Sequence, residues 1–255
     1  CFTFSFWFDS MKSYALALLF LATPLHAQDF GLGGRDFSVD LGLGVSYGPS
    51  WSGADDHEAR PWLIWRNAGF GNPQAANPQG FSISPSLRLL DKREESDDAA
   101  LAGLGDIDRA YEIGGRVSYG IGPVTAHAAL RKGFEGHDGV VGELGVKYRT
   151  DINDRLTLWS GLALNYGDSD FTQTYYGVTT DQAGTSDYDE HTPGGGFTSA
   201  TARIEARYSI TDSTALIGEV QYGRLIGDAA DAPFIQDKDQ PLVRLGIVRN
   251  FSFSF

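Results

Sequence analysis

Residues 37–47 read Phe-Ser-Val-Asp-Leu-Gly-Leu-Gly-Val-Ser-Tyr, and this stretch decides the fold class. Apolar and aromatic residues occupy its odd positions, while polar residues and glycine occupy its even positions. A period of two is that of a β-strand with one apolar and one polar face. The same alternation returns in residues 81–89, 107–119, 156–166, 202–208 and 243–255. The sequence therefore predicts an all-β protein.

Composition excludes several classes of protein. The chain has 255 residues, of which 42% are hydrophobic and 13% aromatic, a formal net charge of -13 and one cysteine. Disordered chains lack this apolar content, disulfide scaffolds need more cysteine, and nucleic-acid binders are basic. Beyond the N-terminal leader, no apolar run reaches the roughly 18 residues of a membrane-spanning helix.

The N-terminus predicts export from the cytoplasm. Residues 1–10 precede Met11, the one methionine, and are interpreted as upstream sequence or a misassigned start. Residues 11–27 have the pattern of a signal peptide, with Lys12, an apolar run over Tyr14–Ala22, and small residues before the expected cleavage after Ala27. Residues 28–255 are then the mature domain.

Charges on the polar faces of the strands distinguish a membrane barrel from a soluble sandwich. In a transmembrane barrel the apolar face meets lipid, the charged face lines the lumen, and aromatic residues form girdles at both interfaces. Apolar segments here end in Tyr or Phe, as the chain itself does at Phe255. We predict an antiparallel, up-and-down transmembrane β-barrel. The mid-strand charges are Arg88, Glu112, Arg116, Arg131, Glu143, Lys147, Arg203, Glu205, Arg207, Glu219 and Arg244.

The connections predict about ten strands. Long outer loops are expected at 48–57, 92–105, 133–139, 167–196 and 227–241, alternating with short inner turns at 120–122, 150–154 and 210–213. The inner connection Ala68–Gln79 is unusually long. An extra hairpin there, or at Phe171–Val178, would give twelve strands.

The outer loops are strongly acidic, with eighteen Asp or Glu residues against three bases, Lys92, Arg93 and Lys238. One interpretation is a solvated acidic crown. The other is binding of divalent cations that bridge the loops to lipopolysaccharide, since hard cations prefer clustered carboxylates. No loop has an ordered series of ligands, so no metal site is predicted.

Two residue sets have the types needed for catalysis. Asp106 and Asp108, with Asp189 and His191, have the composition of an aspartate and histidine protease site. His127 and Ser118 have the types of a base and a nucleophile. Such sets arise readily by chance in an acidic chain, so we predict no catalytic or cofactor-binding residue and no enzyme.

The lumen has two interpretations. Its charges of mixed sign can pair and fill a narrow barrel, or line a small water path. Arg249 breaks the alternation and would face lipid, so either a bulge resets the register or its side chain reaches the interface.

Four segments together resemble one protein family. They are Gly42–Pro49 continuing through Trp51–Asp56 to Arg60–Pro61, then Gly103–Asp108, Gln173–Val178 and Arg224–Pro233. In this order they are similar to the MltA-interacting protein (MipA/OmpV) family of Gram-negative outer membranes.

The resemblance implies an outer-membrane barrel in contact with lipid and lipopolysaccharide. It also implies a scaffold that joins a periplasmic lytic transglycosylase to a murein synthase, for which Ala68–Gln79 and Gln28–Arg35 are the expected inner surface. The alternatives are a small-solute channel, or a surface adhesin or antigen with acidic outer loops. No cofactor and no nucleic-acid partner are implied.

Overall fold

A computed structural model of the chain describes residues 37–70 and 79–253, with side chains described from 38 to 66 and from 79 onward. The expected upstream segment and signal peptide lie outside these residues. The described chain forms one sheet of ten antiparallel strands. The strands are β1 (Phe37–Pro49), β2 (His57–Phe70), β3 (Gly80–Leu90), β4 (Ala110–Ile121), β5 (Val124–Glu135), β6 (Val140–Asp151), β7 (Leu156–Gly167), β8 (Gly196–Ser209), β9 (Thr214–Leu225) and β10 (Asp239–Phe253).

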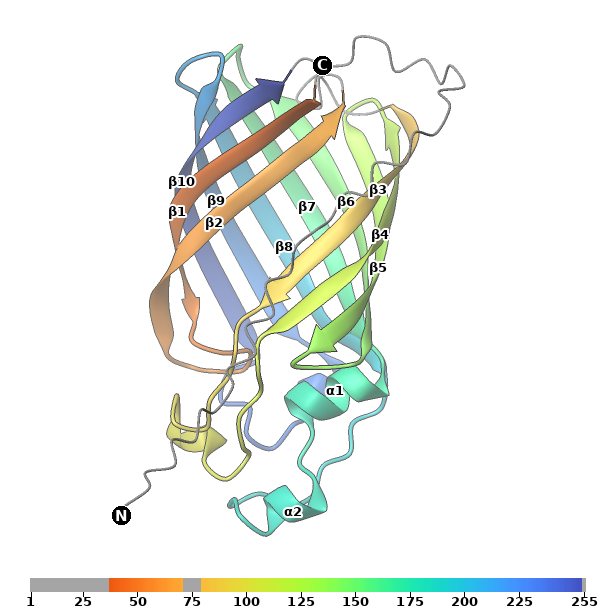
Figure 1. Ribbon diagram of the computed structural model, residues 1–255, viewed down its shortest axis with the longest axis vertical. Coiled ribbons are helices and arrows are strands. Elements are labelled where there is room, and N and C mark those ends of the chain that lie inside the picture. Colours follow the sequence, from red (N-terminus) through yellow and green to blue (C-terminus); the bar gives the residue numbers. More distant parts are fainter. Residues whose placement is uncertain (1–36, 71–78, 254–255) are drawn as a thin grey trace, which may run out of the picture. The chain divides into compact units, whose positions relative to one another are not determined.

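The sheet curls into a barrel with strand order β2-β1-β10-β9-β8-β7-β6-β5-β4-β3 (Figure 1). The two terminal strands pair with each other, from Phe37 with Phe253 to Tyr47 with Val243. Strands β2 and β3 are therefore the edges, and no backbone ladder joins them within the described residues. Each edge strand contains a proline, Pro61 or Pro85. Proline lacks an N–H donor and is confined mainly to edge strands within sheets.

The strand count of the described chain confirms the prediction of ten. At Phe171–Val178, the twelve-strand alternative is wrong, because helix α1 (Ser169–Tyr176) covers most of that segment. Asp168 caps this helix, its side chain accepting a hydrogen bond from the backbone N–H of Phe171. The other candidate position, Ala68–Gln79, lies mostly outside the described residues. None of the described helices is long and apolar enough to cross a membrane.

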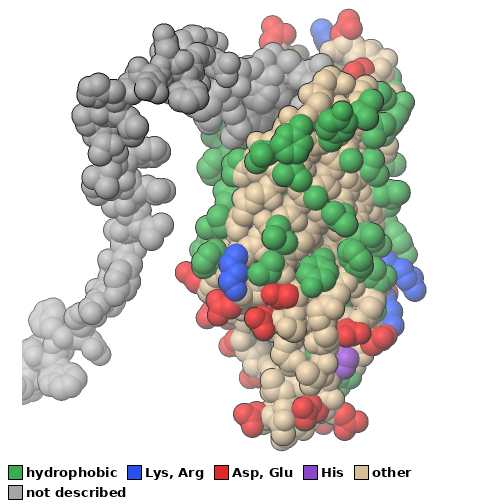
Figure 2. All heavy atoms as spheres, turned by 90° about the vertical axis from the view of Figure 1, so that its right-hand side faces the viewer, with side chains coloured by type: hydrophobic (Ala, Val, Ile, Leu, Met, Phe, Trp, Pro, Cys, Tyr) green, Lys and Arg blue, Asp and Glu red, His purple; other side chains and the backbone are tan. Residues whose placement is uncertain are grey.

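The apolar faces point outward, as predicted (Figure 2). Leu63, Ile83, Leu162, Ile204 and Leu245 are among the residues whose side chains are more than half exposed on this wall. In water such a surface would be an aggregation hazard, whereas in a bilayer it is the surface that lipid covers.

Aromatic side chains form the two expected girdles. The aromatic side chains of both girdles are exposed and lie near strand ends. The loop end carries Tyr47, Tyr111, Phe134, Tyr166, Phe197 and Tyr222, and the opposite end carries Phe81, Tyr119, Tyr148, Tyr208, Phe251 and Phe253. Aromatic rings at both interfaces are typical of transmembrane barrels.

Arg249 faces outward, as the alternation predicts. The register between β9 and β10 runs without a shift from Asp239 to Arg249, so no bulge redirects the side chain there. Its guanidinium lies 5.9 Å from the ring centroid of Phe251 in the girdle. The arginine therefore sits at the membrane interface, where a cation on the lipid face costs least.

The orientation of the strands can be tested on β8. Replacing Ile204 by Arg is expected to destabilise the barrel by about 2–4 kcal/mol, because the residue faces lipid midway along the strand. Urea unfolding in lipid vesicles, followed by tryptophan fluorescence, measures the loss. Thr201→Glu is the control for a charge on the other face, because Thr201 faces the positively charged lumen between Ala163 and Gly223 and a loss below about 1 kcal/mol is expected there. Equal losses would contradict the assigned faces.

Candidate functional site: the charged lumen and its loop cap

Glu112 on β4 organises one side of the lumen. Its carboxylate is fully buried and accepts two hydrogen bonds from Arg88 on β3, at 2.7 and 2.6 Å. Arg131 on β5 donates a third from Nε at 3.0 Å. His137, in the loop between β5 and β6, places Nε2 at 3.4 Å from the same carboxylate. One buried acid thus holds three elements together.

Glu143 on β6 continues this network. It accepts a hydrogen bond from Arg116 at 2.9 Å and bonds Nε2 of His127 at 2.8 Å. Arg131 lies between the two acids, with Nη2 at 3.6 Å from Glu143. Neighbouring strands β3 to β6 are therefore cross-linked inside the barrel by one set of ion pairs.

A second network occupies the opposite wall around Glu219 on β9. This buried carboxylate contacts Arg244 at 3.1 Å, Arg66 at 3.4 Å and Arg203 at 3.8 Å. Arg66 also pairs with Glu205 on β8. A third, smaller group joins Asp40 on β1 to Arg207 at 2.9 Å and to Asn250 at 3.0 Å. The prediction that lumen charges of mixed sign pair across strands is confirmed.

Cations outnumber acids in the lumen. Among the described residues, and leaving out the pairs Arg60–Glu58 and Arg149–Asp151 at the strand ends, eight inward-facing cations meet five acids. The cations are Arg66, Arg88, Arg116, Arg131, Lys147, Arg203, Arg207 and Arg244, and the acids are Asp40, Glu112, Glu143, Glu205 and Glu219. The interior is thus positive while the outer loops are negative.

Apolar side chains fill part of the lumen near the end opposite the long loops. Ile64, Ala215, Ile217 and Val248 are buried together, with Trp62 packed against them. Arg66 and Arg244 lie over the Trp62 ring at 5.4 and 5.3 Å. Glycine permits this packing at Gly42, where a Cβ would lie 2.2 Å from the carbonyl oxygen of Ile247. Side chains therefore occupy the lumen along the wall of β1, β2, β9 and β10.

The long loops form a folded cap with its own apolar core. We use "cap" for residues 50–56, 91–109, 136–139, 168–195 and 226–238, which lie at one end of the barrel (Figure 1). The core includes Trp51, Leu101 and Phe234, which come from three different loops, together with Phe171 and Val178 from the loop 168–195. An acidic crown is therefore an incomplete description, because the acidic surface covers a packed interior.

Hydrogen bonds join the loops of the cap to one another. Tyr188 donates to the carbonyl of Ala100 at 3.0 Å, and Thr185 donates to that of Gly103 at 2.9 Å. The carbonyl of Gly53 accepts from the backbone N–H groups of Gln236 and Asp237. Helix α2 (Thr180–Ala183) begins with a capping box between Thr179 and Gln182. These bonds fix the loops over the mouth of the barrel.

Arg93 lies at the junction between cap and lumen and is only 8% exposed. Its Nη1 donates to the carbonyl of Tyr175 at 3.0 Å, and its guanidinium lies over the ring of Phe234 at 5.4 Å. Burial lowers the pKa of Arg93 and raises the pKa of Tyr175 to about 12. The sequence alone identifies Arg93 only as a loop base, because Tyr175 and Phe234 are distant from it in the chain.

Asp106 and His191, considered for catalysis, make separate contacts in the cap. Asp106 accepts a hydrogen bond from the backbone of Glu95, and His191 pairs with Val178 in an isolated bridge, its Nε2 lying 3.4 Å from the Asp228 carbonyl. In the described part of the chain, no group of three or more His, Cys, Asp or Glu residues could hold a metal ion.

His127 and Ser118 are direct cross-strand partners on β5 and β4, which the sequence alone could not establish. The short contact of His127 is nevertheless with Glu143, at 2.8 Å from Nε2. Arg116 and Arg131 flank the same carboxylate. These contacts hold the Glu143 carboxylate in place in the lumen.

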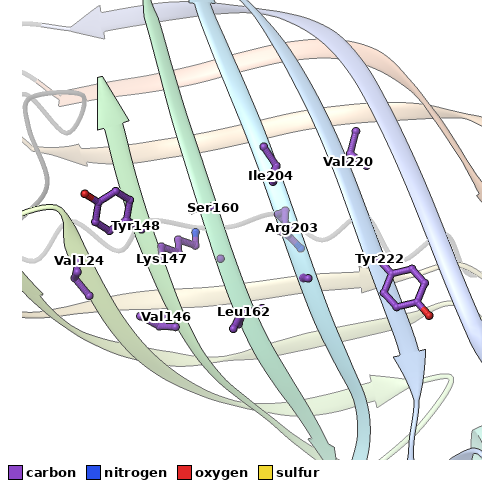
Figure 3. Close-up of a pocket in the computed structure, with 12 residues that line it drawn as sticks. Val124, Val146, Lys147, Tyr148, Ser160, Leu162, Arg203, Ile204, Val220 and Tyr222 are labelled. Carbon is purple, nitrogen blue, oxygen red and sulfur yellow. The ribbon is translucent and has the colours of Figure 1, made fainter. Parts of the chain in front are cut away.

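A hollow of about 520 Å³ lies on the outer wall over β5 to β9 (Figure 3). Small residues Ser160, Gly161 and Ala202 line it between the larger Tyr148 and Tyr222. Its surface is almost entirely apolar and belongs to the face that we assign to lipid. The chemistry of the site therefore resides in the lumen and beneath the cap.

The family profile described as MltA-interacting protein MipA matches residues 41–251, from β1 to the end of β10. The chain belongs to the MipA family. Membership confirms the family predicted by resemblance and places the barrel in the outer membrane. A search of curated proteins found no relative.

Several solved structures are similar barrels. An outer-membrane channel of Pseudomonas putida F1, COG4313, is 11% identical with a TM-score of 0.46, covering 86% of this chain and 96% of that one. The DcaP channel of Acinetobacter baumannii is 11% identical with a TM-score of 0.37, covering 86% and 97%. At these scores the likeness carries no argument about function.

The buried network predicts a large effect of one neutral substitution. Glu112→Gln is expected to destabilise the barrel by about 3–5 kcal/mol, because it removes the buried charge that Arg88 and Arg131 share and leaves Arg131 with the more distant Glu143, at 3.6 Å. Urea unfolding in vesicles measures the loss. Glu94→Gln removes the exposed pair with Lys92 and is expected to cost about 0–1 kcal/mol. A loss for Glu112→Gln no larger than this would show that the network contributes little.

The cap is expected to lose stability in alkaline solution. The pKa of Tyr175 is about 12 in the folded chain against 10.0 for a free tyrosine, so ionisation favours the unfolded state. The stabilisation of the folded state by neutral Tyr175 is complete below pH 10 and disappears as the pH approaches 12. A titration of phenolate absorbance should show a late step that is absent from the Tyr175→Phe variant and from the urea-unfolded chain. A late step that persists in Tyr175→Phe would contradict the assignment.

Proposed function

We propose that this chain is an outer-membrane scaffold that binds a periplasmic lytic transglycosylase and brings it to a murein synthase. The observation that carries the proposal is the family match, whose description names an interaction with MltA and which spans nearly the whole barrel. A protein anchored in the outer membrane with its short turns in the periplasm is placed to recruit enzymes that work on murein.

The interior of the barrel supports this role over solute passage. Ion pairs bridge the strands from both walls, and Ile217 and Val248 are 1% exposed within the lumen. At the outer end the cap has a packed core. A channel needs a continuous polar path, whereas a scaffold needs only a stable anchor with an accessible periplasmic end.

Within the described residues, the surface available for docking at the periplasmic end consists of short turns. These turns lie around Gly122, Asn153–Arg155 and Thr211–Ser213. The segment Ala68–Gln79, which the sequence predicts to lie at the same end, is largely outside the described residues. Asn153 and Thr211 hold their turns through hydrogen bonds to backbone N–H groups. Asp154, Arg155 and Asp212 are exposed and are not needed for those bonds. These three charges are the contacts to test.

The test is capture of the tagged full-length chain from mildly cross-linked, detergent-solubilised envelopes, followed by mass spectrometry. We expect a lytic transglycosylase and a murein synthase to be recovered with the unchanged protein. Replacing Asp154, Arg155 and Asp212 by Ser is expected to reduce recovery at least about tenfold, because charged contacts steer and fix such interfaces.

The matched control removes two acids and one base from the opposite end, at Lys92, Glu94 and Asp187, and should leave recovery unchanged. Both variants must be equally abundant and folded in the membrane. Absence of both murein enzymes from the unchanged protein would reject the scaffold. Conductance in planar bilayers, altered by Arg116 or Arg207 substitution, would instead support a channel.

A further inference from the structure

We propose that the junction between the lumen and the cap binds one small oxyanion, such as sulfate, phosphate or a free carboxylate, through Arg93 and Tyr175. This inference is independent of the scaffold role. The site lies where the cap segments 91–109, 136–139 and 168–195 meet the outer ends of β3, β4 and β5. Three properties of the site favour an anion, namely its excess positive charge, its donors without a partner and the fixed positions of its side chains.

The charge at the junction is unbalanced. Arg88 and Arg131 share the single carboxylate of Glu112, and Arg131 reaches Glu143 at 3.6 Å. Glu143 is already engaged by Arg116 and His127. Arg93 makes no ion pair with any described carboxylate and is buried. Because a buried, unpaired cation is costly, a bound anion would relieve the excess positive charge.

Two buried donors at this junction also lack a partner. In the described part of the chain, Nε of Arg93 and the hydroxyl of Tyr175 make no hydrogen bond, whereas Nη2 of Arg131 and Nε2 of His137 lie 3.6 Å from Glu143 and 3.4 Å from Glu112. His137 accepts a hydrogen bond at Nδ1 from the backbone of Gly139, so a neutral ring carries its proton on Nε2. The high pKa of Tyr175 keeps its hydroxyl protonated near neutral pH. Arg93 and Tyr175 therefore offer donors, and a fully ionised oxyanion such as sulfate offers only acceptors.

The donors belong to one connected set of contacts. Arg93 bonds the carbonyl of Tyr175, the Tyr175 ring lies 5.5 Å from that of His137, and His137 reaches Glu112. Two backbone hydrogen bonds between Arg93 and Ile107 fix the loop, and stacking on Phe234 fixes the guanidinium. Donors held in place before binding lower the entropic cost of capturing a ligand. Ordered water could satisfy the donors, but it would not neutralise the charge.

The direct test is equilibrium dialysis of the full chain, folded in detergent micelles, against radiolabelled sulfate at constant ionic strength. We expect saturable binding of one sulfate per chain. Arg93→Met keeps the length of the side chain and removes the cation, so affinity should fall at least about tenfold. Tyr175→Phe should weaken binding about three- to tenfold. Arg109→Met, on the same loop but exposed, is the matched control and should stay within about twofold.

Thermal unfolding of the same samples distinguishes an anion from ordered water. Without sulfate, Tyr175→Phe should leave Tm unchanged or raise it, because the hydroxyl removed has no partner. With saturating sulfate, Tm should rise more in the unchanged protein than in Tyr175→Phe or Arg93→Met. Heat-modifiable migration on gels confirms that each variant folds.

Three results would overturn the proposal. They are no saturable sulfate binding by the unchanged chain, equal binding by Arg93→Met and Arg109→Met, or a fall in Tm for Tyr175→Phe that is the same with and without sulfate. The last result would assign the donors to ordered water.

Discussion

A strand that crosses a lipid bilayer must have its N–H and C=O groups bonded to neighbouring strands, because no water in the hydrocarbon can replace them. The ladder between β1 and β10 meets this constraint where the two ends of the barrel sequence come together. It also leaves β2 and β3 as the edges, where Pro61 and Pro85 reduce the number of free donors. The alternation of lipid-facing and lumen-facing side chains, the ion pairs across the lumen and the positions of the loops all follow from this sheet.

The cap depends on the lumen beneath it. Glu112 is anchored by Arg88 and Arg131 on the barrel wall and reaches His137 in the cap. The His137 ring then contacts Phe171 and Tyr175 of α1 at 5.1 and 5.5 Å. A packed loop core thus rests on a buried ion network, so the stability of the outer surface is tied to charges inside the membrane.

The alternation of residues 37–47 predicts the strand and its lipid-facing side, and that of residues 243–255 predicts the outward orientation of Arg249, because these properties follow from a period of two. The same reasoning does not predict the register between paired strands or the contacts between loops. Ser118 and His127 meet only because β4 and β5 pair in one particular register. The helix at Ser169–Tyr176 had a local signal in its Asp168 cap, but the hydrophobic pattern around Phe171 also fitted a strand. Arg93 had no local signal, since its neighbours come from distant loops.

The opposite charges of the loops and the lumen constrain what the barrel can hold. Exposed carboxylates on the cap are screened within about 8–10 Å at physiological ionic strength, whereas buried pairs are screened much less. The acidic surface therefore influences approach, and the arginines inside determine what is retained. Because Glu112, Glu143 and Glu219 are each shared by two or three arginines, adding a cation to this interior is unfavourable and adding an anion is favourable. The acidic exterior and the positive interior thus follow from different requirements, solubility of the loops and cross-linking of the strands.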